Sequence, residues 1–300
     1  MTATQSLISD TKTVLVPKRP RYRIWEIDFL RGLCIILMIL DHLMMLIGLF
    51  FGPVWFGNGH RVTATGGGAD FCRWCLDFYN SDTHATLHTI VLFVFFSISG
   101  ISCTFSRSNL RRGCILAFVA LLYSLVTYAL ESIVSGILVT FGVLHFYAVC
   151  ILLYALVSFL CRRNAVAISA VSAAIIVVAT CLYFLYTPPA DTPTWLFFIF
   201  PPENYYGVKT TFYSVTAMSP GDLFTLIPWA AFFFAGTMIA PVLYARKYSL
   251  LPFLDGKWHK PVCFVGKYAI FFYLAHVLVL TALLMMISYL FITPGNWVLL

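Results

Sequence analysis

The sequence predicts an all-α polytopic integral membrane protein, a helix bundle of about seven transmembrane helices. Of the 300 residues, 61% are hydrophobic and 10% are charged, whereas a soluble domain of this size has about 25% charged residues. The apolar residues gather into long stretches, each near the ~20 residues that a helix needs to cross a bilayer. Most positive charges lie in the short connections between these stretches, as in membrane proteins with a fixed orientation.

The predicted spans follow one another along a single domain. Residues 1–20 are polar and lack the apolar core of a signal peptide, so we expect a disordered cytoplasmic segment there, followed by one transmembrane domain over residues 21–300. The last span is long enough to begin as a segment at the membrane interface. The expected spans are residues 28–51, 86–106, 113–131, 140–161, 165–187, 222–245 and 264–292.

The basic residues predict the orientation of these spans. In a seven-span arrangement, the basic connections all fall on one side of the membrane. Their residues are Lys18, Arg19, Arg21 and Arg23 before the first span, Arg107, Arg111 and Arg112 after the second, Arg162 and Arg163 after the fourth, and Arg246, Lys247, Lys257 and Lys260 after the sixth. The positive-inside rule then places the N-terminus inside and the C-terminus outside. We expect a plasma or inner membrane, and the net charge of +7 reflects orientation, not nucleic-acid binding.

Two connections on the opposite side are long and show little evident secondary structure. They cover residues 52–85 and 188–221. Loops of this length are often lids or binding surfaces. Both are rich in aromatic residues, which also favour the membrane interface. Binding and anchoring therefore both stay open as roles for these outer loops.

The first span carries ionisable side chains, which are costly in hydrocarbon and usually functional. His42 follows Arg31 by eleven positions, so the two lie within about 20° of each other on a helix. Asp28 lies within about 40° of His42 on the same side, and Asp41 is adjacent to His42. This face forms a polar track from the cytoplasmic boundary to a histidine in the outer half, as in a buried reaction centre or a proton path.

More ionisable groups belong to the outer half of the predicted bundle. His84 and His88 are one helical turn apart at the outer start of the second span. His145 and Asp222 lie at the outer starts of the fourth and sixth spans, and His276 lies near the middle of the seventh. Each histidine also fits a structural role, either hydrogen bonding across helices or solvation at a helix end.

The cysteines leave the redox compartment undecided. Most of the 9 lie in predicted spans, where cysteine behaves as a small hydrophobe. Cys72 and Cys75 lie in a polar connection, and with His84 and His88 they imitate the spacing of zinc ligands. The gap between the two pairs is shorter than in a zinc finger, so we expect no metal. The sequence leaves open whether Cys72 and Cys75 form a disulfide.

Residues 26–42 resemble the start of the heparan-α-glucosaminide N-acetyltransferase catalytic-domain family, in its bacterial form. They are also similar to the broader transmembrane acyltransferases, whose first helix has an Arg-Gly pair and, eleven residues after the Arg, a histidine. Further segments fit the first family in order, and the resemblance covers about residues 21–290. These segments are residues 96–102, 141–146, 222–236 and 266–276.

The resemblance implies a membrane-embedded acyltransferase. Such an enzyme takes an acetyl group from cytoplasmic acetyl-CoA and passes it to an amine or hydroxyl of a sugar or glycan outside, with a histidine as base or acyl carrier. The family's catalytic histidine lies at the outer end of the bundle, where His84 and His88 are nearest, and His42 aligns with an assisting residue. Of these, His42 and His88 are the leading catalytic candidates, followed by His84.

Further residues have expected roles in binding. Arg31, Arg111 and Lys267 on the cytoplasmic side are assigned to the phosphates or pantetheine of CoA, with pairing to Asp28 as the other role for Arg31. The residues expected to contact the acceptor substrate are Asp41, His145, Asp222 and His276.

Two other functions would also place histidines and carboxylates in spans: a proton-coupled transporter and a non-catalytic membrane scaffold. An odd number of spans without an internal repeat argues against a transporter, and a scaffold would tolerate the loss of the histidines. The expected partners are the lipid bilayer, acetyl-CoA and an outer glycan, whereas a homodimer stays open.

Overall fold

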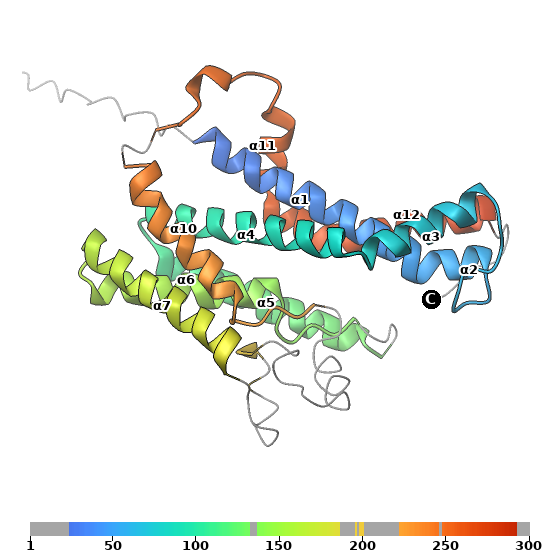
Figure 1. Cartoon of the computed structure of the whole chain (residues 1–300), viewed down its shortest axis with the longest axis horizontal. Coiled ribbons are helices and arrows are strands. Elements are labelled where there is room, and N and C mark those ends of the chain that lie inside the picture. Colours follow the sequence, from blue (N-terminus) through green and yellow to red (C-terminus); the bar gives the residue numbers. More distant parts are fainter. Residues whose placement is uncertain are drawn as a thin grey trace, which may run out of the picture.

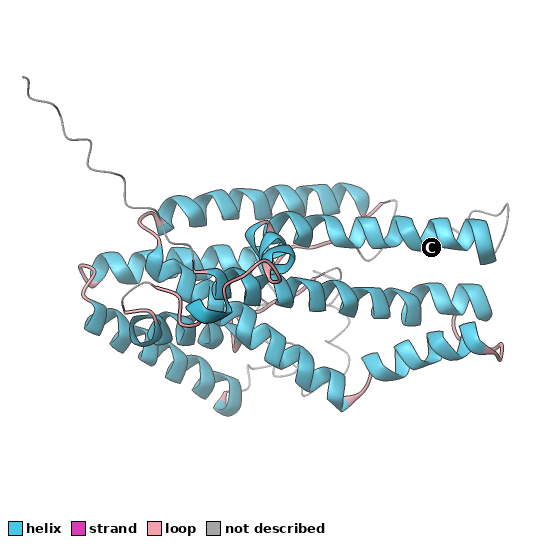
Figure 2. Cartoon of the chain, turned by 90° about the horizontal axis from the view of Figure 1, so that it is seen from above, coloured by secondary structure: helices cyan, strands magenta, loops and turns pink. Residues whose placement is uncertain are grey.

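The computed structural model describes residues 24–132, 137–186, 196, 198–200, 222–245 and 248–292. Within these residues the chain is helical, and its extended pairing is limited to one isolated bridge between Gly57 and Val62. Most of the helices run roughly along one common direction (Figures 1 and 2). The all-α prediction is therefore confirmed. The predicted N-terminal segment 1–20 and most of the predicted outer loop 188–221 lie outside the described residues.

Among the described residues, 6 helices are long and apolar enough to cross a membrane. They are α1 (Trp25–Met45, extended to Phe56), α4 (Asp82–Phe105), α5 (Asn109–Leu130), α6 (Val143–Leu160), α7 (Ala165–Leu185) and α12 (Ala269–Ile287). A further apolar helix, α10 (Trp229–Leu243), has 15 residues. The structure thus agrees with the predicted polytopic bundle. The sequence placed the start of the α10 span at residue 222, but the helix begins later because Pro228 disfavours helical geometry in the residue before it.

The first outer connection is largely helical, so the expected lack of secondary structure is wrong. The π-helix η1 (Leu46–Phe51) and α2 (Gly52–Phe56) continue α1, and α3 (Gly67–Tyr79) packs back on η1. In Figure 1, α2 and α3 lie at one end of the bundle, beside the end of α12. Close packing explains the fold: a Cβ added to Gly48 would lie 2.9 Å from the backbone nitrogen of Leu76. The sequence pattern did not predict α3, because few of its residues are buried.

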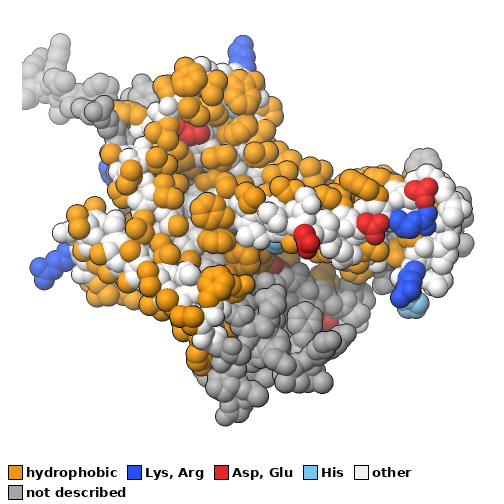
Figure 3. Space-filling view, in the orientation of Figure 1, with side chains coloured by type: hydrophobic (Ala, Val, Ile, Leu, Met, Phe, Trp, Pro, Cys, Tyr) orange, Lys and Arg blue, Asp and Glu red, His pale blue; other side chains and the backbone are white. Residues whose placement is uncertain are grey.

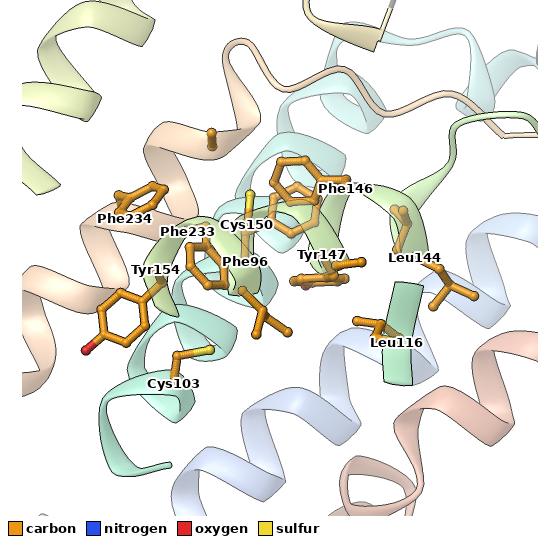
Figure 4. Close-up of a cluster of buried hydrophobic side chains, with 14 of the residues drawn as sticks. Phe96, Cys103, Leu116, Leu144, Phe146, Tyr147, Cys150, Tyr154, Phe233 and Phe234 are labelled. Carbon is orange, nitrogen blue, oxygen red and sulfur yellow. The ribbon is translucent and has the colours of Figure 1, made fainter. Parts of the chain in front are cut away.

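The main core lies between α4, α6 and α10. Phe96, Phe146, Phe233 and Phe234 are each 0% exposed and belong to these helices. Figure 4 shows them together. The rings of Phe96 and Phe146 are tilted relative to each other, with a centroid distance of 4.7 Å. This aromatic cluster fixes the position of α4.

Glycines bring α4 and α10 into backbone contact, as small residues do in membrane bundles. A Cβ on Gly100 would lie 2.0 Å from the carbonyl oxygen of Phe233, and one on Gly236 would lie 1.9 Å from that of Ser97. The Ser97 hydroxyl also donates to the carbonyl of Phe232 at 3.0 Å. The crossing leaves no room for a side chain at either glycine.

A second close crossing joins α1 to α11 (Lys260–Lys267). A Cβ on Gly32 would lie 2.0 Å from the carbonyl oxygen of Val262. The chain turns at Tyr268 from α11 into α12, so the long predicted last span consists of a short helix and a spanning helix. This arrangement brings α12 against α1 and sets His276 beside His42.

The periphery of the helix bundle is apolar, as expected for a surface that faces lipid. Large apolar side chains on α5 and α7 are exposed, among them Phe118 and Val166. Figure 3 shows a mostly hydrophobic face with the basic side chains at its edges and a few acidic side chains within it. The chain is therefore a multi-pass membrane protein.

Candidate active site

The candidate site begins with a contact between two helices. The Oδ1 atom of Asp41 on α1 lies 2.5 Å from Nε2 of His84 on α4. Ser81 caps α4, because its hydroxyl oxygen accepts the backbone N–H of His84 at 3.1 Å. The His84 side chain is only 15% exposed. His84 is therefore held at both its backbone and its ring, which argues against the interpretation of a solvated histidine at a helix end.

This contact sets the chemistry of the His84 ring. A carboxylate only accepts hydrogen bonds, so the nitrogen that faces Asp41 carries the proton. The other ring nitrogen, Nδ1, then keeps its lone pair and can accept a proton. A carboxylate that orients a histidine in this way is the usual partner of a general base.

Aromatic rings surround His84. His88 stacks with it at a centroid distance of 5.8 Å, and the ring of Tyr79 on α3 lies at 4.8 Å. Burial raises the pKa of the Tyr79 hydroxyl, and the nearby Asp41 carboxylate raises it further. Tyr79 therefore stays protonated and can donate a hydrogen bond near His84.

His42 lies on the other side of Asp41. Its Nδ1 is 3.8 Å from Asp41 Oδ2 and donates to the carbonyl of Met38 at 2.9 Å. With the proton on Nδ1, the Nε2 atom of His42 keeps its lone pair. Asp41 thus lies between two histidines that the sequence placed on different spans. The sequence analysis assigned Asp41 to substrate contact, and the structure gives it a partner in His84.

His276 completes the group from α12. Its ring meets that of His42 edge-on at 4.8 Å, and its Nδ1 donates to the carbonyl of Tyr273 at 2.6 Å. The residue is 8% exposed, and its buried Nε2 atom has no hydrogen-bond partner among the described residues. His276 therefore contacts His42 through its ring. Among the described residues, its side chain makes no hydrogen bond to another helix.

Asp222 connects three parts of the bundle near this group. Its Oδ2 atom accepts the hydroxyl of Tyr273 at 2.6 Å and the backbone N–H of Val143 at 2.9 Å. It thereby ties the segment before α10 to α12 and to the start of α6. These contacts give Asp222 a structural role that the sequence analysis did not foresee.

His145 has partners within α5 and α6. Its Nδ1 accepts the N–H of Gly142 at 3.3 Å, and its Nε2 contacts the hydroxyl of Ser124 at 3.1 Å. Both ring nitrogens are thus engaged in holding the start of α6 against α5. Contact with substrate stays a prediction for this residue, and its geometry favours the structural role.

The three basic residues assigned to CoA differ in their surroundings. Arg31 lies inside the bundle, where its Nη2 atom donates to the Ser102 hydroxyl at 2.6 Å and its Nη1 atom to Asp28 at 3.2 Å. Arg111 and Lys267 are exposed. Arg31 therefore joins α1 to α4, and the other two cations are accessible at the predicted cytoplasmic end.

The cysteine and histidine pairs with zinc-like spacing do not come together as a metal centre. Among the described residues, no group of at least 3 His, Cys, Asp or Glu side chains could hold a metal ion. Cys72 and Cys75 face the core around η1, carry no disulfide, and have thiols whose pKa is raised by burial. His84 instead turns to Asp41.

Sequence reasoning missed Tyr79 as a member of the group. The residue lies five positions before His84, and only the helical form of α3 brings its ring against the histidine. A signal was present in the Ser81 cap, which marks the turn between α3 and α4. Tyr273 was visible as a neighbour of His276 one turn away, but its bond to Asp222 depends on the tertiary fold.

Comparison with known proteins gives one match. A family model described as heparan-alpha-glucosaminide N-acetyltransferase, catalytic, matches residues 69–278, more than half of the chain. The matched part contains His84, His88 and His276, and it starts after Asp41 and His42. No curated protein and no solved structure matches the chain.

Proposed function

The chain belongs to the heparan-alpha-glucosaminide N-acetyltransferase catalytic family, a family of transmembrane acetyltransferases, and on this basis we propose the reaction that it catalyses. It moves an acetyl group from cytoplasmic acetyl-CoA to an amine or hydroxyl of a sugar or glycan outside the cell membrane. The observation that carries this proposal is the Asp41–His84 contact, with His42 and His88 beside it.

The reaction needs a general base and a hydrogen-bond donor that stabilises the negative charge on the oxyanion. The acceptor's nitrogen or oxygen attacks the thioester carbonyl, the C–S bond breaks, and the acceptor's proton passes to a histidine. The CoA thiolate then takes up a proton. The Nδ1 atom of His84 and the Nε2 atom of His42 both carry lone pairs that suit this role. The protonated Tyr79 hydroxyl is a donor for the developing oxyanion.

The same histidines also support a covalent route. In that route, a ring nitrogen attacks the thioester first and carries the acetyl group until the acceptor arrives. The carboxylate of Asp41 would stabilise the positive charge that forms on the acetylated ring. Both routes require the histidines to face the donor's reactive end, which enters along the α1 face that carries Arg31.

CoA should stabilise the purified protein against heat. A ligand that binds only the folded state at about 100 times its Kd adds about 2.7 kcal/mol of stability. Because the CoA phosphates are assigned to exposed cytoplasmic cations, Arg111→Gln and Lys267→Gln should each reduce the CoA-induced rise in Tm. The measurement is a thermal-unfolding series with increasing CoA.

The matched control is Arg61→Gln, which removes an exposed cation from the outer connection. This variant should keep the full CoA response. Absence of any rise in Tm for the unmodified protein at high CoA would contradict the proposed donor and would favour a transporter or a scaffold.

A further inference from the structure

The described part of the connection between α10 and α11, residues 248–259, is folded against the start of α1. Glu26 on α1 is 6% exposed, and its Oε1 atom accepts the backbone N–H of Leu250. His259 is 4% exposed, and its ring stacks on that of Trp25 at a centroid distance of 4.3 Å. The connection is therefore tied to the first turn of α1 near each of its ends.

Contacts within the connection also hold its shape. The 3-10 turn η3 (Pro252–Leu254) lies at its centre, and the indole Nε1 of Trp258 donates to the carbonyl of Leu254 at 2.9 Å. The backbone N–H of Gly256 donates to Nε2 of His259 at 3.0 Å. The fold thus determines which side chains the connection presents outwards.

Most of these outward side chains are large and apolar. Phe253 is 77% exposed and Trp258 is 59% exposed. The other exposed members are Leu250, Leu251 and Leu254. A cluster of this kind marks a surface that meets a membrane or a partner. We call it the apolar cluster of the connection.

The apolar cluster continues the surface that faces lipid. In Figure 1 the connection lies on the flank of the bundle, beside α1 and α11. Phe264 on α11 and Phe271 on α12 are exposed as well, and α12 is long and apolar enough to cross the membrane. The position beside the first turns of α1 is the predicted cytoplasmic boundary of the bilayer. Lipid is therefore the occupant that this surface fits best.

The charges at this boundary favour anionic lipid. Lys257 and Lys260 are exposed on either side of Trp258 and His259. The carboxylate of Asp255 has its Oδ1 atom 2.9 Å from Nε2 of His259. A lysine can lay its apolar stem along a membrane surface while its ammonium reaches the headgroups, and tryptophan also favours that interface. Lysines in this position attract the anionic headgroups of the cytoplasmic leaflet.

We propose that residues 248–260 form an interfacial segment that binds anionic phospholipids of the cytoplasmic leaflet. Phe253 and the rest of the apolar cluster enter the boundary between headgroups and acyl chains. Lys257 and Lys260 contact the lipid phosphates. This binding site is separate from the residues of the proposed acetyl transfer, and its test does not depend on that reaction.

The test is photo-cross-linking in nanodiscs of phosphatidylcholine with phosphatidylglycerol as the minor lipid. The change is Phe253→p-benzoylphenylalanine, and mass spectrometry identifies the molecules that become joined to it. We expect cross-links to phospholipid, with phosphatidylglycerol enriched over its share of the bilayer by about fivefold or more, the scale of one lysine near an anionic surface. Because Phe253 is mostly exposed, the change carries little risk to folding.

The double variant Lys257→Gln, Lys260→Gln should remove this enrichment while cross-linking to phospholipid persists. Arg61→Gln is the matched control, since it removes an exposed cation from the predicted outer side, and it should leave the enrichment unchanged. Equal enrichment in the double variant and the control would overturn the binding of anionic lipid. Cross-links to a peptide of this chain or of a second copy, in place of lipid, would overturn the interfacial position itself.

Discussion

His84→Ala should lower acetyl-transfer turnover by about 100-fold or more, the usual scale for the loss of a general acid–base residue. The variant removes the ring that Asp41 orients at 2.5 Å. Asp41→Asn should also lower turnover, because the amide does not provide the carboxylate that accepts the N–H of His84 and lies beside His42. CoA-induced stabilisation should persist in both variants, since the loss falls on the transition state. Turnover and thermal shift are measured on the same preparations.

A matched control comes from the same side of the protein. His60 is exposed in the first outer connection, and His60→Ala should keep the full turnover. Unchanged turnover in His84→Ala would move the base or acyl carrier to His42 or His88, the leading candidates from the sequence. Unchanged turnover in the alanine variants of all three histidines would contradict the histidine mechanism.

Gly236→Ala should have the largest effect on folding. The added Cβ would lie 1.9 Å from the backbone carbonyl oxygen of Ser97, an atom that cannot move without shifting α4. Overpacking typically costs about 1–3 kcal/mol and occasionally more, and here the clash is with backbone. We expect a marked fall in Tm and in the yield of monodisperse protein.

Gly67→Ala is the control for that change. A Cβ at Gly67 meets no atom within 4 Å, so this variant should unfold at the same temperature as the unmodified protein. Equal Tm values for Gly236→Ala and Gly67→Ala would show that α4 and α10 do not pack as closely as described.

The sequence predicted the long spans well because their apolar runs are set by the bilayer thickness. It failed at α3, a helix whose contacts with η1 and α2 depend on Gly48 and Gly52, respectively. It also placed the start of α10 too early, because residues 222–228 are apolar enough to continue the span. Hydropathy predicts which segments lie in the membrane, but it does not predict where a helix within such a segment begins or ends.

The candidate site was predicted in part. The sequence identified the outer histidines and the face shared by Arg31 and His42, since both follow from helical periodicity. It could not show that Asp41 faces His84, because this contact joins residues 43 positions apart on different helices. It likewise missed the engagement of both ring nitrogens of His145, which depends on Ser124 and Gly142.

The most direct test of the central claim is sided acetyl transfer in proteoliposomes. The protein is oriented by protease selection, labelled acetyl-CoA is supplied on the side of the basic connections, and glucosamine or another sugar acceptor is supplied on the opposite side. We expect labelled acetyl-sugar to form on the acceptor's side, with free CoA on the donor's side and about 100-fold less product for His84→Ala. Product that requires donor and acceptor on the same side, or no product from the unmodified protein with any amine or hydroxyl sugar, would contradict transmembrane acetyl transfer.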